Sequence, residues 1–135
     1  MVNVINNSNI ARLPIKSVQQ SVQNVFQGEG IEEYEVNIIY VDSEFIAEMN
    51  EQYLQHEGDT DVITFALNEE DEDISGEIYI CAQVAARQAE EYKVSLQNEI
   101  NRLAAHGALH LCGYDDSSDE LRQEMSKLET KYMSV

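Results

Sequence analysis

Two histidines four residues apart, His106 and His110, restrict the folds open to this chain more than any other feature. On an α-helix this spacing places both imidazoles on one face, one turn apart, where they can share a metal ion. Gly113 predicts the end of that helix, because glycine takes positive φ without steric cost. The chain can then fold back and bring Asp115 or Asp116 to the histidines. Three such ligands leave one coordination position open, as in a catalytic metal site, and favour a metal-dependent hydrolase.

The ligand types indicate zinc, one ion per chain, because imidazole and carboxylate suit its tetrahedral geometry. Nickel, iron, manganese or another divalent metal would also fit these ligands. The spacing further resembles the pattern H-E-x-x-H-x-x-G-x-x-H of metzincin peptidases. Those enzymes need a general-base glutamate directly after the first histidine, and this chain has Gly107 there. A metallopeptidase is therefore the weaker interpretation.

The composition places this site in a small domain that we expect to be cytoplasmic. With 135 residues, the chain is long enough for one domain with a buried core, and we expect residues 1–135 to form a single hydrolase domain. No apolar run approaches the roughly 20 residues of a membrane span, and the start lacks the basic and apolar regions of a signal peptide. The formal net charge of −18 argues against strong non-specific binding of nucleic acid.

Hydrophobic periodicity predicts elements in the order β-α-β-α-β-β-α-α-α. The predicted strands are 2–5, 35–41, 61–66 and 76–81, and the predicted helices are 14–28, 43–53, 82–92, 96–112 and 118–132. The second helix has the apolar stripe Phe45, Ile46, Met49 and Tyr53. The opening β-α-β predicts parallel pairing, and the short acidic loop after residue 66 predicts an antiparallel hairpin. The fold class is α+β, with a small mixed four-stranded sheet packed against about five helices and the metal site on a central helix.

Three sequence blocks resemble the YbeY family of endoribonucleases. The family signature H-G-x-L-H-L-x-G-Y-D-H matches residues 106–116 at every fixed position but the last, where this chain has Asp116. A second block, N-x-x-Y-R-x-x-x-x-x-T-D-V-[LI]-[ST]-F, resembles residues 50–65, and a third, G-D-I-x-I, resembles residues 76–80. The blocks occur in family order, and the resemblance covers residues 35–130.

The resemblance implies a metal-dependent endoribonuclease that cleaves single-stranded rRNA in a bacterial cytoplasm. It implies roles in maturation of the 3′ end of 16S rRNA and in ribosome quality control. Implied partners are the small ribosomal subunit, ribosomal proteins and an assembly GTPase, with no membrane. It also implies that His106, His110 and Asp116 bind the metal and act in catalysis, with Asp116 in place of the family's third histidine.

A second departure from the family concerns residue 54, usually an arginine that can contact a phosphate. Leu54 cannot do so. His56, two residues on, is a predicted catalytic residue that would contact phosphate or act in acid–base chemistry, and its alternative is an exposed loop histidine. The leucine and the negative charge favour a second hypothesis, a ribosome-assembly factor that binds pre-ribosomes and cuts little RNA.

Other acidic residues have two predicted roles each. Asp61, with Thr60, either caps a strand or lines the cleft beside the metal. Glu77 is either the partner of a metal-binding histidine or a solvent-facing strand residue. The acidic run 69–73 is a solvated loop or a contact for a basic partner such as a ribosomal protein.

Overall fold

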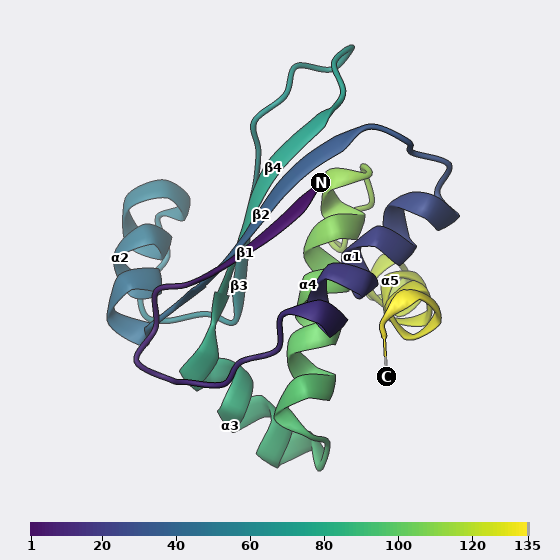
Figure 1. Ribbon diagram of the computed structural model, residues 1–135. Helices are drawn as coiled ribbons and strands as arrows, with labels where there is room; N and C mark the ends of the chain where they lie inside the picture. Colours follow the sequence, from purple (N-terminus) through teal and green to yellow (C-terminus); the bar gives the residue numbers. More distant parts are fainter. Residues whose placement is uncertain (135) are drawn as a thin grey trace.

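The computed structural model describes residues 1–134, and it confirms the predicted α+β fold and the order of its elements (Figure 1). The strands are β1 (Val2–Asn6), β2 (Tyr34–Val41), β3 (Val62–Ala66) and β4 (Ile74–Cys81). The helices are α1 (Lys16–Gly28), α2 (Ser43–Leu54), α3 (Ala82–Tyr92), α4 (Leu96–Leu111) and α5 (Asp119–Tyr132). No helix among residues 1–134 is both long and apolar enough to cross a lipid bilayer.

The four strands form one mixed sheet in the order β1-β2-β4-β3. Strand β2 pairs in parallel with β1 and with β4, and β3 pairs antiparallel with β4. The parallel pairs follow from the helical crossovers, and the antiparallel pair follows from the short acidic loop, which is long enough only for a hairpin. The two central strands are rich in isoleucine, valine and tyrosine, as expected for strands buried on both sides.

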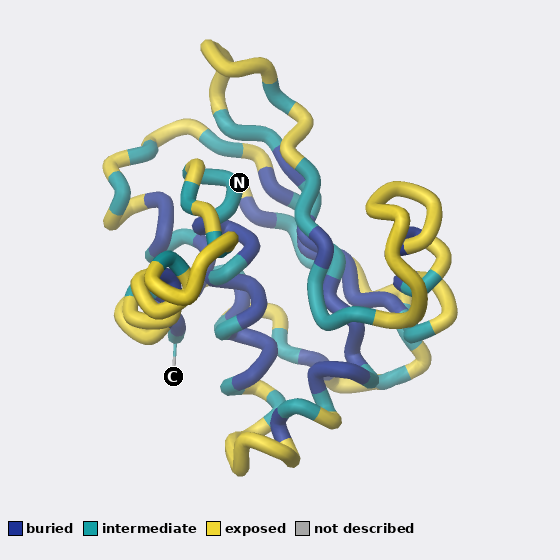
Figure 2. Tube along the Cα trace, turned by 180° about the vertical axis from the view of Figure 1, so that it is seen from behind, coloured by how far each residue is buried: buried dark blue, intermediate teal, exposed yellow. Residues whose placement is uncertain are grey.

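The helices cover the two faces of the sheet unequally. Helices α1 and α4 pack on one face, with α5 against them, while α2 lies alone on most of the other face (Figure 1). The larger core fills the α1–α4 side, where the sheet and α4 are buried (Figure 2). Its fully buried side chains include Val22, Phe26, Ile38, Ile78, Ile100 and Leu109. A smaller cluster lies under α2 and includes Ile46, Met49 and Ile63.

Two aromatic residues of the predicted apolar stripe of α2 are exposed instead. In α2, Ile46 and Met49 are buried, but Phe45 and Tyr53 are 50% and 59% exposed. A single helix contacts this face only along a narrow stripe, and within the described part of the chain no second helix covers the flanking rings. Tyr92, the last residue of α3, is 59% exposed and lies at a cavity beside His106.

Two helix starts differ from the prediction by one or two residues. Helix α1 begins at Lys16 and not at Pro14, whose carbonyl accepts a hydrogen bond from the Tyr40 hydroxyl at 2.5 Å. Helix α5 begins at Asp119 and not at residue 118, and Ser118 caps it by accepting a hydrogen bond from the Leu121 amide at 3.1 Å.

Candidate metal centre

Both histidines lie on α4, which packs directly on the sheet at Gly107. A Cβ at this position would lie 2.8 Å from Ile78 Cγ2 and 2.9 Å from Thr64 Oγ1. Any side chain would therefore hold the helix away from β3 and β4. Gly107 occupies the position at which a peptidase has its glutamate. Because it has no side chain, it also lets α4 pack closely on the sheet, which positions His106 and His110 beside β3.

Replacing Gly107 with alanine should destabilise the protein. Alanine normally stabilises a helix relative to glycine by about 1 kcal/mol. Overpacking against Ile78 and Thr64 costs about 1–3 kcal/mol, so we expect a net loss of up to about 2 kcal/mol in the free energy of unfolding. Urea denaturation of wild type and Gly107→Ala measures this difference. A variant more stable than wild type would show that α4 does not depend on this close contact.

The chain returns towards the histidines through a loop that is anchored to α1. Gly113 ends α4 with φ of +101°, as predicted, and its amide donates to the His110 carbonyl at 3.0 Å. The Tyr114 hydroxyl donates to Glu29 Oε1 at 2.7 Å, and the Tyr132 hydroxyl of α5 donates to Glu29 Oε2 at 2.6 Å. One carboxylate therefore ties the loop and α5 to the end of α1.

This bridge should make folding stability depend on pH in the acid range. Hydrogen bonds from Tyr132 and Tyr114 hold the pKa of Glu29 below the usual value of a glutamate. A carboxylate with a lowered pKa stabilises the fold above its unfolded-state pKa, and this contribution is lost as pH falls through the folded-state pKa. Wild type should therefore be more stable than Glu29→Gln near neutral pH, and the difference should shrink below about pH 4.

Urea denaturation of both proteins over a pH series measures this effect. The exposed Glu33, replaced with glutamine, is the control and should keep the pH dependence of wild type. Parallel curves for wild type and Glu29→Gln would contradict a stabilising role for the ionised bridge.

The structure brings His106, His110 and Asp116 together. The two Nε2 atoms are 3.0 Å apart, and Asp116 Oδ2 lies 3.4 Å from His106 Nε2 and 3.6 Å from His110 Nε2. In a tetrahedral zinc site, bonds of about 2.0–2.2 Å place ligand atoms about 3.3–3.6 Å apart. The two distances to Asp116 fall in this range and the Nε2–Nε2 distance is slightly shorter, so the donor set can close around a small divalent ion. The alternative, Asp115, uses its carboxylate within the turn and accepts from the Asp116 amide at 2.8 Å and the Ser117 hydroxyl at 2.6 Å.

The other ring nitrogens of the two histidines are bonded to acceptors outside the cluster. His110 Nδ1 donates to the Tyr114 carbonyl at 3.0 Å, and His106 Nδ1 bonds Glu129 Oε2 at 2.6 Å. A neutral imidazole that donates from Nδ1 carries its free lone pair on Nε2. These two contacts favour the tautomer whose Nε2 lone pair is free, which is the form that a metal ligand needs.

Glu129 is the partner of His106 that the sequence did not predict. Its side chain is 9% exposed, and its Oε1 atom accepts from Arg102 Nη1 at 3.2 Å. Burial alone lowers the pKa of His106, but the hydrogen bond and charge of Glu129, with the charges of Asp116 and Asp61, raise it overall.

A sequence signal for Glu129 does exist. It falls on the buried stripe of α5 between Met125 and Tyr132, where an unpaired carboxylate would be costly. Glu77, predicted as one option for this role, is instead on the opposite face of the sheet, where its Oε1 accepts from the Tyr79 hydroxyl at 3.1 Å.

Two cavities meet at the histidine–aspartate cluster. The larger, of about 530 Å³, is lined by the three residues of the cluster, by Leu54 and by 61–64. The smaller, of about 250 Å³, shares His106, Asp116 and Asp61 and is also lined by Arg102 and Arg122. Asp61 thus lines both cavities, in agreement with one of its predicted roles. His56 lies in the exposed loop after α2 and is not among the residues that line either cavity.

Comparisons with known proteins agree with this fold. The family model described as Endoribonuclease YbeY matches residues 3–135. The chain is 35% identical over 123 residues to Endoribonuclease YbeY of Chloroherpeton thalassium, covering 91% of this chain and 86% of the relative. It is 41% identical over 122 residues to Endoribonuclease YbeY of Pelotomaculum thermopropionicum, covering 84% and 80%. The solution structure of a Thermotoga maritima protein is similar with a TM-score of 0.70 and 32% identity, over 98% of this chain and 86% of that chain.

Proposed function

Because the chain belongs to the YbeY family of endoribonucleases, we propose that it is a metal-dependent enzyme that cleaves single-stranded rRNA. It would act as a single domain spanning 1–135, in the bacterial cytoplasm, at the 3′ end of 16S rRNA and in ribosome quality control. The observation that carries the proposal is the convergence of three donor atoms, from His106, His110 and Asp116, at the meeting point of two cavities.

In this proposal the residues of the cluster hold zinc or another divalent ion through Nε2 of His106, Nε2 of His110 and Oδ2 of Asp116. Such an ion would acidify a water molecule or polarise a phosphoryl oxygen of the substrate. Glu129 and the Tyr114 carbonyl hold the two imidazoles in the orientation and tautomer that ligation needs.

The positive charge beside the cluster comes from α4 and α5, and residue 54 at the larger cavity is a leucine. Arg102 and Arg122 both line the smaller cavity, and Arg122 Nη1 donates to the Asp116 carbonyl at 3.2 Å. Guanidinium groups at this position would attract the phosphates of an RNA strand that crosses the cluster. We propose that these two arginines supply part of the phosphate contact that residue 54 cannot.

The second function that we consider is a ribosome-assembly factor with little nuclease activity. It is favoured by the apolar Leu54 at the larger cavity and by the net charge of −18, both of which weaken contact with RNA. In either function the proposed partners are the small ribosomal subunit, ribosomal proteins and an assembly GTPase.

A cleavage assay separates the two functions. The purified protein is incubated with a single-stranded segment from the 3′ end of 16S rRNA, with the same segment as a duplex, and with a chelator followed by added zinc or manganese. The nuclease predicts cleavage of the single strand only, lost in chelator and restored by metal. Cleavage that persists in chelator would exclude metal-dependent chemistry. Absent cleavage with retained co-sedimentation on small subunits would favour the assembly factor.

A further inference from the structure

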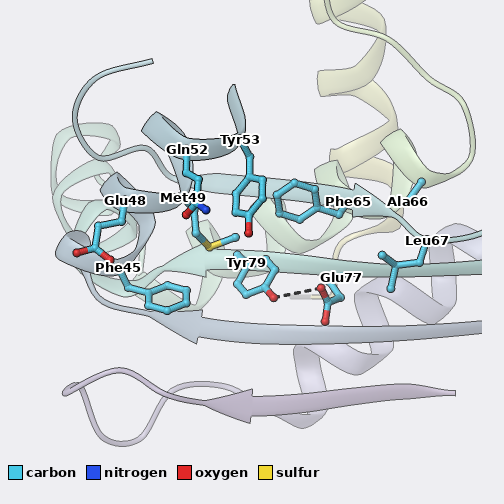
Figure 3. Close-up of a pocket in the computed structure, with 10 residues that line it drawn as sticks. All are labelled: Phe45, Glu48, Met49, Gln52, Tyr53, Phe65, Ala66, Leu67, Glu77 and Tyr79. Carbon is cyan, nitrogen blue, oxygen red and sulfur yellow. Dashed lines mark hydrogen bonds between the residues drawn. The ribbon is translucent and has the colours of Figure 1, made fainter. Parts of the chain in front are cut away.

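A second surface lies on the sheet face opposite α4, where a groove runs between α2 and the sheet (Figure 3). It encloses about 430 Å³ and contains four aromatic rings, from Phe45, Tyr53, Phe65 and Tyr79. Neighbouring rings are in contact, with centroids 6.4 Å apart for Phe45 and Tyr79, 5.9 Å for Tyr79 and Phe65, and 5.7 Å for Phe65 and Tyr53. We call this row of rings the aromatic groove.

The aromatic groove is open because, among residues 1–134, α2 alone covers most of this face. Phe45 and Tyr53 are half or more exposed, and Leu67 at the end of the row is 59% exposed. A contiguous apolar surface of this kind, rimmed by polar side chains, is typical of a binding site. The volume is also in the range that takes a small ligand or a few side chains of a partner.

The charged side chains that line the aromatic groove, Glu48 and Glu77, are both acidic. Figure 3 shows Glu48 at one end of the row and Glu77 towards the other, where the Tyr79 hydroxyl donates to Glu77 at 3.1 Å. Residues 17–86, which include α2, β3 and β4, contain no lysine or arginine, although most of the 26 acidic residues of the chain lie there. The groove therefore combines π-faces with a strongly negative surrounding.

We propose that the aromatic groove binds an arginine-rich segment of a basic protein. A guanidinium group stacks on the faces of tyrosine and phenylalanine, and its N–H groups pair with carboxylates such as Glu48 and Glu77. Lysine satisfies the charge but lacks the planar group that stacks. Aromatic rings also stack RNA bases, but none of the described residues that line the groove is a lysine or arginine that could neutralise the phosphates. The surface is separate from the metal centre, and the inference does not depend on nuclease activity.

The test is an NMR titration of the full-length, isotope-labelled protein with three probes. These are a short peptide of alternating arginine and valine, the same peptide with lysine, and single-stranded oligouridine. We expect saturable shifts at the aromatic groove with the arginine peptide and weaker binding of the lysine peptide. Tyr53→Ala should weaken binding of the arginine peptide about two- to fivefold, and Glu48→Gln should weaken it as well.

The control variant is Tyr92→Ala, since Tyr92 is also 59% exposed but lies outside the aromatic groove. It should bind the arginine peptide as wild type does, and so should His110→Ala, whose nuclease activity is expected to be lost. Equal weakening by Tyr53→Ala and Tyr92→Ala would overturn the proposal. So would equal binding of the two peptides, or groove shifts produced by oligouridine and not by the arginine peptide.

Discussion

Replacing His110 with alanine should remove bound metal and reduce RNA cleavage by more than about 100-fold. Exchange of a residue that merely orients a metal ligand typically costs about 10- to 100-fold, so loss of one of three protein ligands should cost more. His110 is 30% exposed at its side chain and touches the cluster through Nε2, so the core should stay intact. Elemental analysis of the purified variant and a gel assay on single-stranded rRNA measure the two effects.

The third histidine is the matched control. His56→Ala removes the same group from an exposed loop, and its metal content should equal that of wild type. Cleavage should fall about 100-fold if His56 acts in acid–base catalysis, and unchanged cleavage would remove it from the predicted catalytic set. Full metal content in His110→Ala would contradict the proposed centre, and full content in Asp116→Ala would show that Asp116 is not an essential ligand.

The features that sequence predicts well here are local ones. The spacing of His106 and His110 and the positive φ of Gly113 are set within one helix and its end, so pattern and elementary sterics are enough to predict them. The parallel pairing of β1 with β2 and the antiparallel pairing of β3 with β4 follow in the same way from one β-α-β unit and one short hairpin loop. Both predictions need only residues that are near one another in the chain.

The features that sequence missed depend on which elements pack together. Periodicity marks Phe45 and Tyr53 as part of an apolar stripe, but it does not show that α2 is alone on most of its face of the sheet. Glu129 reaches His106 across the contact of α4 and α5, which are joined by the same loop that carries Asp116. The sequence identifies a carboxylate in a buried stripe, but its partner is known only once the two helices are placed.

The contact between Glu129 and His106 should support metal binding, so we expect Glu129→Gln to weaken metal binding about 10- to 100-fold. Glutamine keeps the size of the side chain but removes the charge and one of the acceptors that fix His106 Nδ1 and Arg102. His106 would then be free to turn or to place its proton on Nε2, the atom that a metal needs. Competition with a chromophoric chelator measures the affinity, and urea denaturation measures stability in parallel.

The comparison of affinity with stability separates two roles for Glu129. If the residue only anchors α5 through Arg102, Glu129→Gln would lower the free energy of unfolding and leave the metal affinity of the folded protein unchanged. If it positions His106, affinity falls even where the variant is fully folded. Glu124→Gln, an exposed change on the same helix, should alter neither quantity. Because Glu129 contacts both His106 and Arg102, we expect a loss of affinity that exceeds what the loss of stability alone would produce.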